Sequence, residues 1–505
     1  MNDIPNATVS TPPLGGRGLR VIMFVGTGSD VGKSVISAAF CRIFLQDGYC
    51  PAPFKAQNMS LNSFATPDGL EIGRAQAVQA EACGIPCSVE MNPVLLKPTN
   101  YTTSQVVLNG KPAGNKSAQQ YFNETDRDGL FNEAMKSCYR LMENHNPVVI
   151  EGAGSISEIN LWDRDITNMR VAETLNAPTY LIADIDRGGV FASVFGTIEL
   201  LPQNQRDLIK GIIINKFRGD ISLFDDGRKM LEKITGKPVV GIIPYFNNIY
   251  IEQEDSVVID NAKRNAESGK INIAVVLLRH MSNFTDFDML EHHPDVNLYY
   301  TASSDELSRA DIILLPGSKN TISDLIYLRN NGMAKAIIEE HKKGKAVYGI
   351  CGGFQMMGES IQDPLGIEGE ISGIHGLGIL PVKTIITQDK KTEQCTFKFL
   401  DGTEANVGYE IHMGVTSADK SSPLCKTNGR FDDGYFLNSK TFGTYIHGFF
   451  DNAETVQYIL NQVEKSAVVE FDHRAFKEEQ YNKLAQHVRN HVDLEYIYKT
   501  MELDD

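Results

Sequence analysis

Short runs of consecutive apolar residues recur along the chain, and longer polar or helical stretches separate them. Such alternation is typical of parallel strands joined by helical crossovers. The first series of runs lies at 21–25, 148–150, 180–183, 211–214 and 239–243, and the second at 273–278, 312–315 and 346–350. We therefore predict an α/β protein with two doubly wound domains.

A mostly polar stretch at 253–270 interrupts this alternation and is interpreted as a linker. A further short strand is expected to carry the segment 444–447. The expected organisation is a flexible N-terminus, a first domain, the linker, a second domain and a charged helical extension, at 1–20, 21–252, 253–270, 271–452 and 453–505.

The composition is that of an ordinary water-soluble protein, with 42% hydrophobic and 22% charged residues among 505. No apolar segment approaches the roughly 18 residues that a membrane-spanning helix needs, and 1–20 lacks a hydrophobic signal core. We therefore expect a cytoplasmic protein without a membrane partner.

The net charge of −16 argues against a nucleic-acid partner. The oligomeric state is not predicted. Eight scattered cysteines indicate reduced thiols.

The clearest chemical motif is the segment 347–358, where an apolar strand runs into Gly-Ile-Cys351-Gly-Gly and then a helix. This is the form of a nucleophile elbow, in which flanking glycines permit a strained turn that exposes the central side chain. Backbone N–H groups of the helix would favour a thiolate. A buried, inert thiol is the alternative, but the glycines favour Cys351 as a nucleophile.

A second motif follows the run 21–25 and precedes a predicted helix. Its residues form a phosphate loop that would bind ATP: Gly26, Thr27, Gly28, Ser29, Asp30, Val31, Gly32, Lys33 and Ser34. Backbone N–H groups would cradle phosphates, Lys33 would reach the terminal phosphates, and the Ser34 hydroxyl would ligate Mg²⁺. Thr27 stands where the strict motif has glycine, and this form resembles the phosphate loop of dethiobiotin synthetases. A glycine-rich turn without a ligand is the alternative.

Polar residues at other strand ends in the first domain are further candidates, because doubly wound sheets bind ligands at the carboxyl ends of their strands. Glu151 is the preferred second Mg²⁺ ligand, while Glu71 and Asp184 stay open as additional ones. Asn215 could pair with a purine ring, although a turn-forming asparagine is nearly as plausible. Helix capping is an equally good explanation for Asp184.

A cysteine nucleophile needs a base and a group of donors for the oxyanion. His447 ends a predicted strand and is followed by glycine, and it is preferred over His412 as the base. Gly317 and Gly352 are expected to present backbone N–H groups to the oxyanion, although the Pro-Gly sequence at 316–317 could be a simple turn.

The segment 273–450 resembles the class I glutamine amidotransferases, in which a cysteine and a late histidine release ammonia from glutamine through a thioester. It departs from their common triad because Phe449 stands where a glutamate is usual. That variant is similar to the cobyrinic and cobyric acid synthase branch. Whether Glu410 or His412 assists His447 stays open.

Three long polar segments in the first domain, at 52–63, 71–77 and 91–98, resemble the cobyric acid synthase family, and the likeness extends over nearly the whole chain. The resemblance implies ATP- and glutamine-dependent amidation of the b, d, e and g carboxylates of adenosylcobyrinic acid a,c-diamide, a corrinoid. The expected donors to this substrate are Lys55, Gln57, Asn58, Arg74, Gln76, Asn92 and Lys97.

Two other functions share parts of this pattern. A glutamine-dependent ligase for another carboxylate, such as a cobyrinic acid a,c-diamide synthase, would use both motifs and differ only in its acceptor. A partitioning-type regulatory ATPase would use the phosphate loop but would have no use for Cys351.

Overall fold

The computed structural model describes residues 21–98, 103–117, 121, 126–252, 266–400, 402, 405–463 and 471–502. The first domain is built on a fully parallel sheet of order β12-β11-β10-β1-β9-β2. Its strands are β1 (Val21–Gly26), β2 (Ala52–Phe54), β9 (Val148–Glu151), β10 (Thr179–Asp184), β11 (Ile209–Phe217) and β12 (Val239–Pro244).

Helices cover both faces of this sheet, because successive side chains of each strand point to opposite sides. Along β1, Met23 and Val25 pack into one hydrophobic cluster, whereas Ile22 and Phe24 pack into the other. The helices are α1 (Lys33–Gln46), α2 (Arg74–Ala82), α4 (Arg127–Asn144), α5 (Met169–Leu175), α6 (Val190–Leu200), α7 (Gln203–Leu208) and α8 (Asp225–Thr235).

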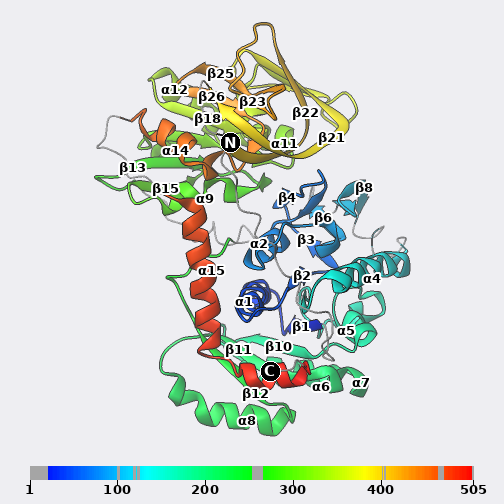
Figure 1. Cartoon of the computed structure of the whole chain (residues 1–505). Helices are drawn as coiled ribbons and strands as arrows, with labels where there is room; N and C mark the ends of the chain where they lie inside the picture. Colours follow the sequence, from blue (N-terminus) through cyan, green and yellow to red (C-terminus); the bar gives the residue numbers. More distant parts are fainter. Residues whose placement is uncertain are drawn as a thin grey trace, which may run out of the picture.

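An insertion between β2 and α4 adds two small sheets to the first domain. One has the order β3-β6-β7-β8, and the other pairs β4 with β5. Their strands are β3 (Gln57–Met59), β4 (Ser63–Ala65), β5 (Glu71–Gly73), β6 (Val94–Pro98), β7 (Thr103–Leu108) and β8 (Lys111–Ser117). The insertion lies on the side of the first domain that faces the second (Figure 1).

The second domain has its own sheet, of order β15-β13-β16-β18-β26-β25, in which only the β25–β26 pair is antiparallel. Its strands are β13 (Ile271–Val276), β15 (Val296–Thr301), β16 (Ile312–Leu315), β18 (Ala346–Ile350), β25 (Tyr435–Asn438) and β26 (Thr441–Thr444). The helices are α9 (Asp288–His292), α10 (Ser304–Leu307), α11 (Thr321–Asn330), α12 (Met333–Lys342) and α13 (Gly352–Met357). The predicted α/β class with two doubly wound domains is confirmed.

A second, largely antiparallel sheet in this domain has no counterpart in the sequence prediction. Two long strands, β21 (Val382–Phe399) and β22 (Asn406–Ala418), form its centre. The shorter strands are β19 (Ser360–Gln362), β20 (Gly373–His375), β23 (Cys425–Thr427), β24 (Phe431–Asp433) and β27 (Ile446–His447), and a separate ribbon pairs β14 (Met281–Ser282) with β17 (Gly317–Ser318). The single strand expected at 444–447 is wrong, because β26 ends at Thr444 and β27 pairs with β22 instead.

The C-terminal helices join the two domains. The first helix, α14 (Ala453–Leu460), packs into the core of the second domain, whereas α15 (His473–Arg489) runs alongside the first (Figure 1). There Leu484 and Val488 share a hydrophobic cluster with Phe40 and Phe44 of α1.

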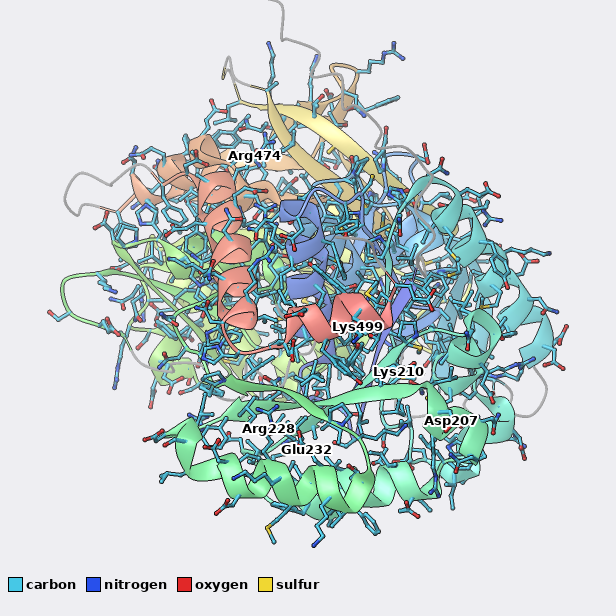
Figure 2. All side chains as sticks on the ribbon, turned by 60° about the horizontal axis from the view of Figure 1, so that its bottom comes forward. Asp207, Lys210, Arg228, Glu232, Arg474 and Lys499 are labelled. Atoms are coloured by element: carbon cyan, nitrogen blue, oxygen red, sulfur yellow. The ribbon has the colours of Figure 1, made fainter. Side chains whose placement is uncertain are left out.

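The last helix, α16 (Leu494–Thr500), continues this packing. The Tyr496 hydroxyl donates to the Lys210 carbonyl of β11 at 2.9 Å. Lys210 and Lys499 mark these two segments in Figure 2, which also shows Arg228 and Glu232 on α8. Among the described residues, no helix combines the length and apolar character that a bilayer crossing requires.

Candidate active sites

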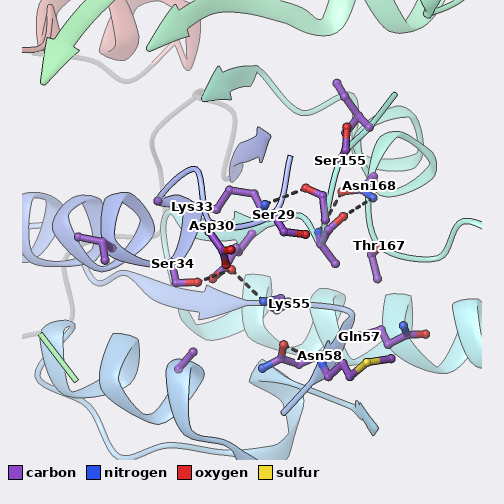
Figure 3. Close-up of a pocket in the computed structure, with 18 of the residues that line it drawn as sticks. Ser29, Asp30, Lys33, Ser34, Lys55, Gln57, Asn58, Ser155, Thr167 and Asn168 are labelled. Atoms are coloured by element: carbon purple, nitrogen blue, oxygen red, sulfur yellow. Dashed lines mark hydrogen bonds and ion pairs between the residues drawn. The ribbon is translucent and has the colours of Figure 1, made fainter. Parts of the chain in front are cut away.

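The loop between β1 and α1 has the backbone shape of a phosphate-binding turn. Gly32 has φ of 100° and Asp30 has φ of 57°, so the loop depends on left-handed backbone at two positions. A side chain at Gly32 would also meet the Asn215 amide at 2.1 Å. The Lys33 ammonium donates to the carbonyls of Gly28 and Gly154 at 2.8 Å each, which fixes it over the loop (Figure 3).

A buried carboxylate stands beside this loop. Glu151 at the end of β9 is 1% exposed and accepts hydrogen bonds from Ser34 Oγ at 2.8 Å, Lys55 Nζ at 2.9 Å and Gln79 Nε2 at 2.7 Å. Burial tends to raise the pKa of Glu151, but the Lys55 charge and these donors outweigh it and lower the pKa. Ser34 and Glu151 thus bring two hard oxygen atoms together, which are the ligands that Mg²⁺ prefers.

Burial also acts on Lys33, where it lowers the pKa to about 8 even though Glu151 pulls the pKa upward. The ammonium therefore lies in a site of low polarity, where its interaction with a phosphate would be strengthened.

A cavity of about 1120 Å³ opens in front of the loop. Single small-molecule sites usually measure roughly 300–1000 Å³, so this one has room for a nucleotide and part of a second ligand. Of the predicted ATP-binding residues, those that line it are Ser29, Asp30, Gly32, Lys33, Ser34 and Asn215. Gly26, Thr27, Gly28 and Val31 shape the loop behind it, and Asn215 Nδ2 donates to the Val31 carbonyl at 2.8 Å.

The seven residues expected to bind the substrate do not form one group. Lys55, Gln57 and Asn58 line the large cavity (Figure 3). Arg74 instead pairs with Glu252 at 2.6 Å, and Gln76 accepts from Asn58 Nδ2 at 3.0 Å.

Asn92 and Lys97 also depart from the expected group. Asn92 Nδ2 donates to the carbonyls of Lys55 and Val94 at 3.1 and 3.0 Å. Lys97 lines a different cavity, described below, because β6 carries it toward the second domain.

The two additional metal ligands left open by the sequence are paired with lysines. Glu71 is fully buried between Lys97, at 2.7 Å, and Lys390 of the second domain. Asp184 pairs with Lys216 at 2.9 Å. Neither carboxylate is among the residues that line the cavity in front of the phosphate loop.

Cys351 occupies a strained turn between β18 and α13, with φ of 51° and ψ of −107°. Such a conformation is rare for a residue with a side chain and usually marks a functional position. The turn needs the neighbouring glycines: a Cβ at Gly353 would lie 2.0 Å from the Leu315 carbonyl oxygen, and one at Gly352 would lie 2.7 Å from Ser318 N.

His447 interacts with the Cys351 thiol and is held from behind by a carboxylate that the sequence interpretation did not identify. His447 Nδ1 lies 2.7 Å from Asp286 Oδ2, and the Gly448 amide donates to Asp286 Oδ1 at 2.9 Å. Burial tends to lower the pKa of His447, but Asp286 and Cys351 together raise it to about 10. Both neighbours therefore favour the protonated, imidazolium form of His447.

The two residues left open as assistants of His447 hydrogen-bond to other partners, although His412 lines the cavity that contains Cys351, described below. Glu410 accepts from Lys391 at 2.8 Å and pairs with His412 Nε2 at 3.0 Å. His412 Nδ1 lies 2.8 Å from the Gly414 carbonyl. The orienting carboxylate is Asp286, in a 3₁₀ turn at Phe284–Phe287, 161 residues before the histidine.

The thiol lies in a cavity of about 290 Å³ that residues of both domains line. Lys97 and Gln105 come from the first domain, and Lys319, Glu368 and Lys390 from the second. The two glycines expected to form the oxyanion site lie close by, since a Cβ at Gly317 would be 3.3 Å from His447 Cε1.

Comparison with known proteins agrees with this arrangement. Residues 22–257 match the CobQ/CobB/MinD/ParA nucleotide binding domain, and residues 272–455 match the CobB/CobQ-like glutamine amidotransferase domain. The chain is 58% identical to a cobyric acid synthase of Parabacteroides distasonis, over 96% of this chain and 99% of that protein. It is 56% identical to one of Bacteroides fragilis, over 97% and 100%, and 45% identical to one of Syntrophobacter fumaroxidans, over 96% and 99%. A nucleotide-binding domain, a glutamine amidotransferase domain and this identity along the full length lead to one conclusion: the chain belongs to the cobyric acid synthase family.

Proposed function

We propose that this glutamine-hydrolysing ligase amidates the b, d, e and g carboxylates of adenosylcobyrinic acid a,c-diamide, with ATP as the activating reagent and glutamine as the nitrogen donor. The observation that carries the proposal is the presence of two built sites in one chain of this family. One surrounds a phosphate loop, and the other surrounds a strained cysteine with a histidine and an aspartate. The enzyme is expected to act in the cytoplasm, where ATP and glutamine are available.

At the second site, Cys351 Sγ attacks the side-chain amide carbon of glutamine. His447 gives its proton to the departing nitrogen, so that ammonia leaves and a thioester stays on Cys351. Asp286 holds the imidazole by its Nδ1 and stabilises the positive charge. Water then cleaves the thioester, which releases glutamate and restores the thiol. The N–H groups near Gly317 and Gly352 are the proposed donors to the oxyanion.

At the first site, a carboxylate of the corrinoid attacks the terminal phosphorus of ATP. Lys33 and the loop amides hold the phosphates and stabilise the charge that develops on the transferred group. Ser34 and Glu151 are the residues that would hold Mg²⁺, which would neutralise phosphate charge when bound. Ammonia then attacks the acyl phosphate, forming the amide and releasing phosphate.

The large cavity continues beyond the phosphate loop into a region suited to a broad, flat and anionic acceptor. Trp162, Leu161 and Met169 give this region apolar surface. Arg127 and Arg170 give it positive charge, although the carboxylates of Glu158, Asp165 and Glu173 also line the cavity. Such local cations are needed because the protein as a whole is acidic, with a net charge of −16. Together with Lys55, Gln57 and Asn58, these residues are the proposed acceptor site.

The experiment is a panel of carboxylate acceptors offered with ATP and glutamine, in which ADP and glutamate are measured for each acceptor. The proposal expects the corrinoid to stimulate release of both products in equal amounts. A ligase for another carboxylate would respond to a different member of the panel. A regulatory ATPase would release ADP without glutamate, and either result would contradict the proposal.

A further inference from the structure

The cavity around Cys351 contains more positive than negative charge. Three ammonium groups line it or reach it, on Lys97, Lys319 and Lys390. Glu71 takes up two of them, since both Lys97 and Lys390 bind its carboxylate. All three partners in that group have side chains exposed by 5% or less, so solvent does little to screen them.

The third ammonium, on Lys319, forms no ion pair with Glu71. Its Nζ donates to Gln105 Oε1 at 2.9 Å, which is a neutral acceptor. Over the described ranges of the chain, no carboxylate lies within ion-pairing distance of it. Burial and the charges of Lys390 and Lys97 lower the pKa of Lys319 to about 7, against the opposing but weaker effects of Glu71 and of Glu368, which lines the same cavity.

Lys319 lies on a segment that packs against the turn carrying the nucleophile Cys351. Lys319 directly follows β17, which ends at Ser318. A Cβ at Gly352 would lie 2.7 Å from Ser318 N. Gly352 is the residue after Cys351. The ammonium therefore reaches into the cavity from a segment that packs against the elbow itself.

Glutamine brings a permanent anion to this cavity, its α-carboxylate, at the opposite end of the molecule from the amide that Cys351 attacks. A charge-assisted hydrogen bond to a lysine in a dry cavity would hold that group in a fixed position. We propose that the α-carboxylate of glutamine binds the Lys319 ammonium, in a subsite that Gln105 of the first domain completes. This inference rests on the proposed glutaminase activity and adds its specificity determinant.

Gln105 links glutamine recognition to the contact between the two domains. It is 6% exposed, lies on β7 of the first domain and is the partner that holds Lys319 in place. Glutamine recognition is therefore complete only when the first domain is docked against the second. Gln105 acts here as a positioning residue, because it acts through Lys319.

The test compares glutamine with 4-aminobutanamide, which has the same amide but no α-carboxylate. Lys319→Met should lower kcat/KM for glutamine roughly 10- to 100-fold, mainly through KM, because a hydrogen bond to a charged group is lost. The value for 4-aminobutanamide should change by less than about threefold, since that amide never had this contact. Lys319→Arg should recover part of the glutamine preference, and Gln105→Leu should raise the KM for glutamine with a smaller effect.

Lys335→Met is the matched control, because Lys335 is 82% exposed on α12 and lies outside both cavities. Its kinetics should equal those of the parent protein with both amides. The inference is overturned if Lys319→Met lowers kcat/KM for the two amides by the same factor, because the lysine would then not read the carboxylate. A parent protein that releases glutamate from glutamine under no condition would instead overturn the proposed function.

Discussion

The substitution Asp286→Asn separates the charge of the orienting carboxylate from its shape. In the parent protein Asp286 Oδ2 lies 2.7 Å from His447 Nδ1, and the two side chains are 2% and 1% exposed. Asparagine can still accept from the Gly448 amide, which bonds the other oxygen at 2.9 Å. The substitution removes the negative charge that favours the His447 imidazolium. It also removes the acceptor oxygen that holds the imidazole ring by Nδ1.

The expected magnitude follows from this contact. A buried hydrogen bond to a charged group contributes roughly 1.5–3 kcal/mol, and each 1.4 kcal/mol is a factor of about ten. Glutaminase kcat/KM should therefore fall roughly 10- to 200-fold. Because the pKa of His447 is raised to about 10 by Asp286 and Cys351 against burial, removing Asp286 lowers that pKa. The protonated form then disappears at a lower pH, so activity should decline at lower pH than in the parent.

The assay is glutamate release across a pH series, together with amide formation from ammonium chloride as a measure of the first site. Ammonia-dependent amidation should be unchanged, since His447 takes no part in it. Glu340→Gln is the matched control: Glu340 is also buried and paired, with Lys343 at 2.7 Å, but lies outside both cavities. Parent-like glutaminase in Asp286→Asn, with an unchanged alkaline decline, would refute this role of the carboxylate.

Three further predictions concern single residues. Cys351→Ala should abolish glutamine-dependent amidation, by roughly 10³-fold or more, while ammonium salts still support amide formation; full glutamine activity would make the thiol structural. Lys33→Ala should lower amidation with either nitrogen source by roughly 10²-fold or more, and normal ammonia-dependent synthesis would exclude the phosphate loop from the reaction. Glu71→Gln leaves Lys97 and Lys390 without their carboxylate and should lower the free energy of unfolding by roughly 3–5 kcal/mol, measured by denaturant titration. Burial opposes ionisation of Glu71, but the two lysines hold its pKa well below 4.5, so its contribution to stability is present above that pH and is lost as the pH falls. The parent should therefore approach the stability of Glu71→Gln in acid, and a difference in unfolding free energy that stays constant as the pH falls would contradict this.

The sequence could predict motifs and elements that are defined by residues close together in the chain. The β1 loop and the Cys351 elbow each combine a strand, a glycine turn and a helix within about a dozen positions, so local backbone chemistry defines them. The parallel strands are recognisable for a similar reason, because strands buried on both faces are apolar at nearly every position.

Features that depend on distant pairing were not predictable. Asp286 lies 161 residues from His447, and its segment carries several polar residues of which only the fold selects one. The polar segments from 52 to 98 were expected at a single site, but β3 faces the large cavity whereas β6 carries Lys97 to the thiol. The long β21–β22 pair escaped prediction because buried residues are interspersed with exposed and half-buried ones along both strands, so neither strand forms a continuous apolar run.

The most direct test of the central claim is mass spectrometry of the corrinoid itself. Purified protein is incubated with adenosylcobyrinic acid a,c-diamide, ATP, Mg²⁺ and glutamine, and the molecular mass of the corrinoid is measured at intervals. Each replacement of a hydroxyl by an amino group lowers the mass by about one unit, so the account predicts stepwise losses that end when the b, d, e and g carboxylates are all amides. A corrinoid of unchanged mass, in a preparation that amidates an unrelated carboxylate with the same reagents, would contradict the account.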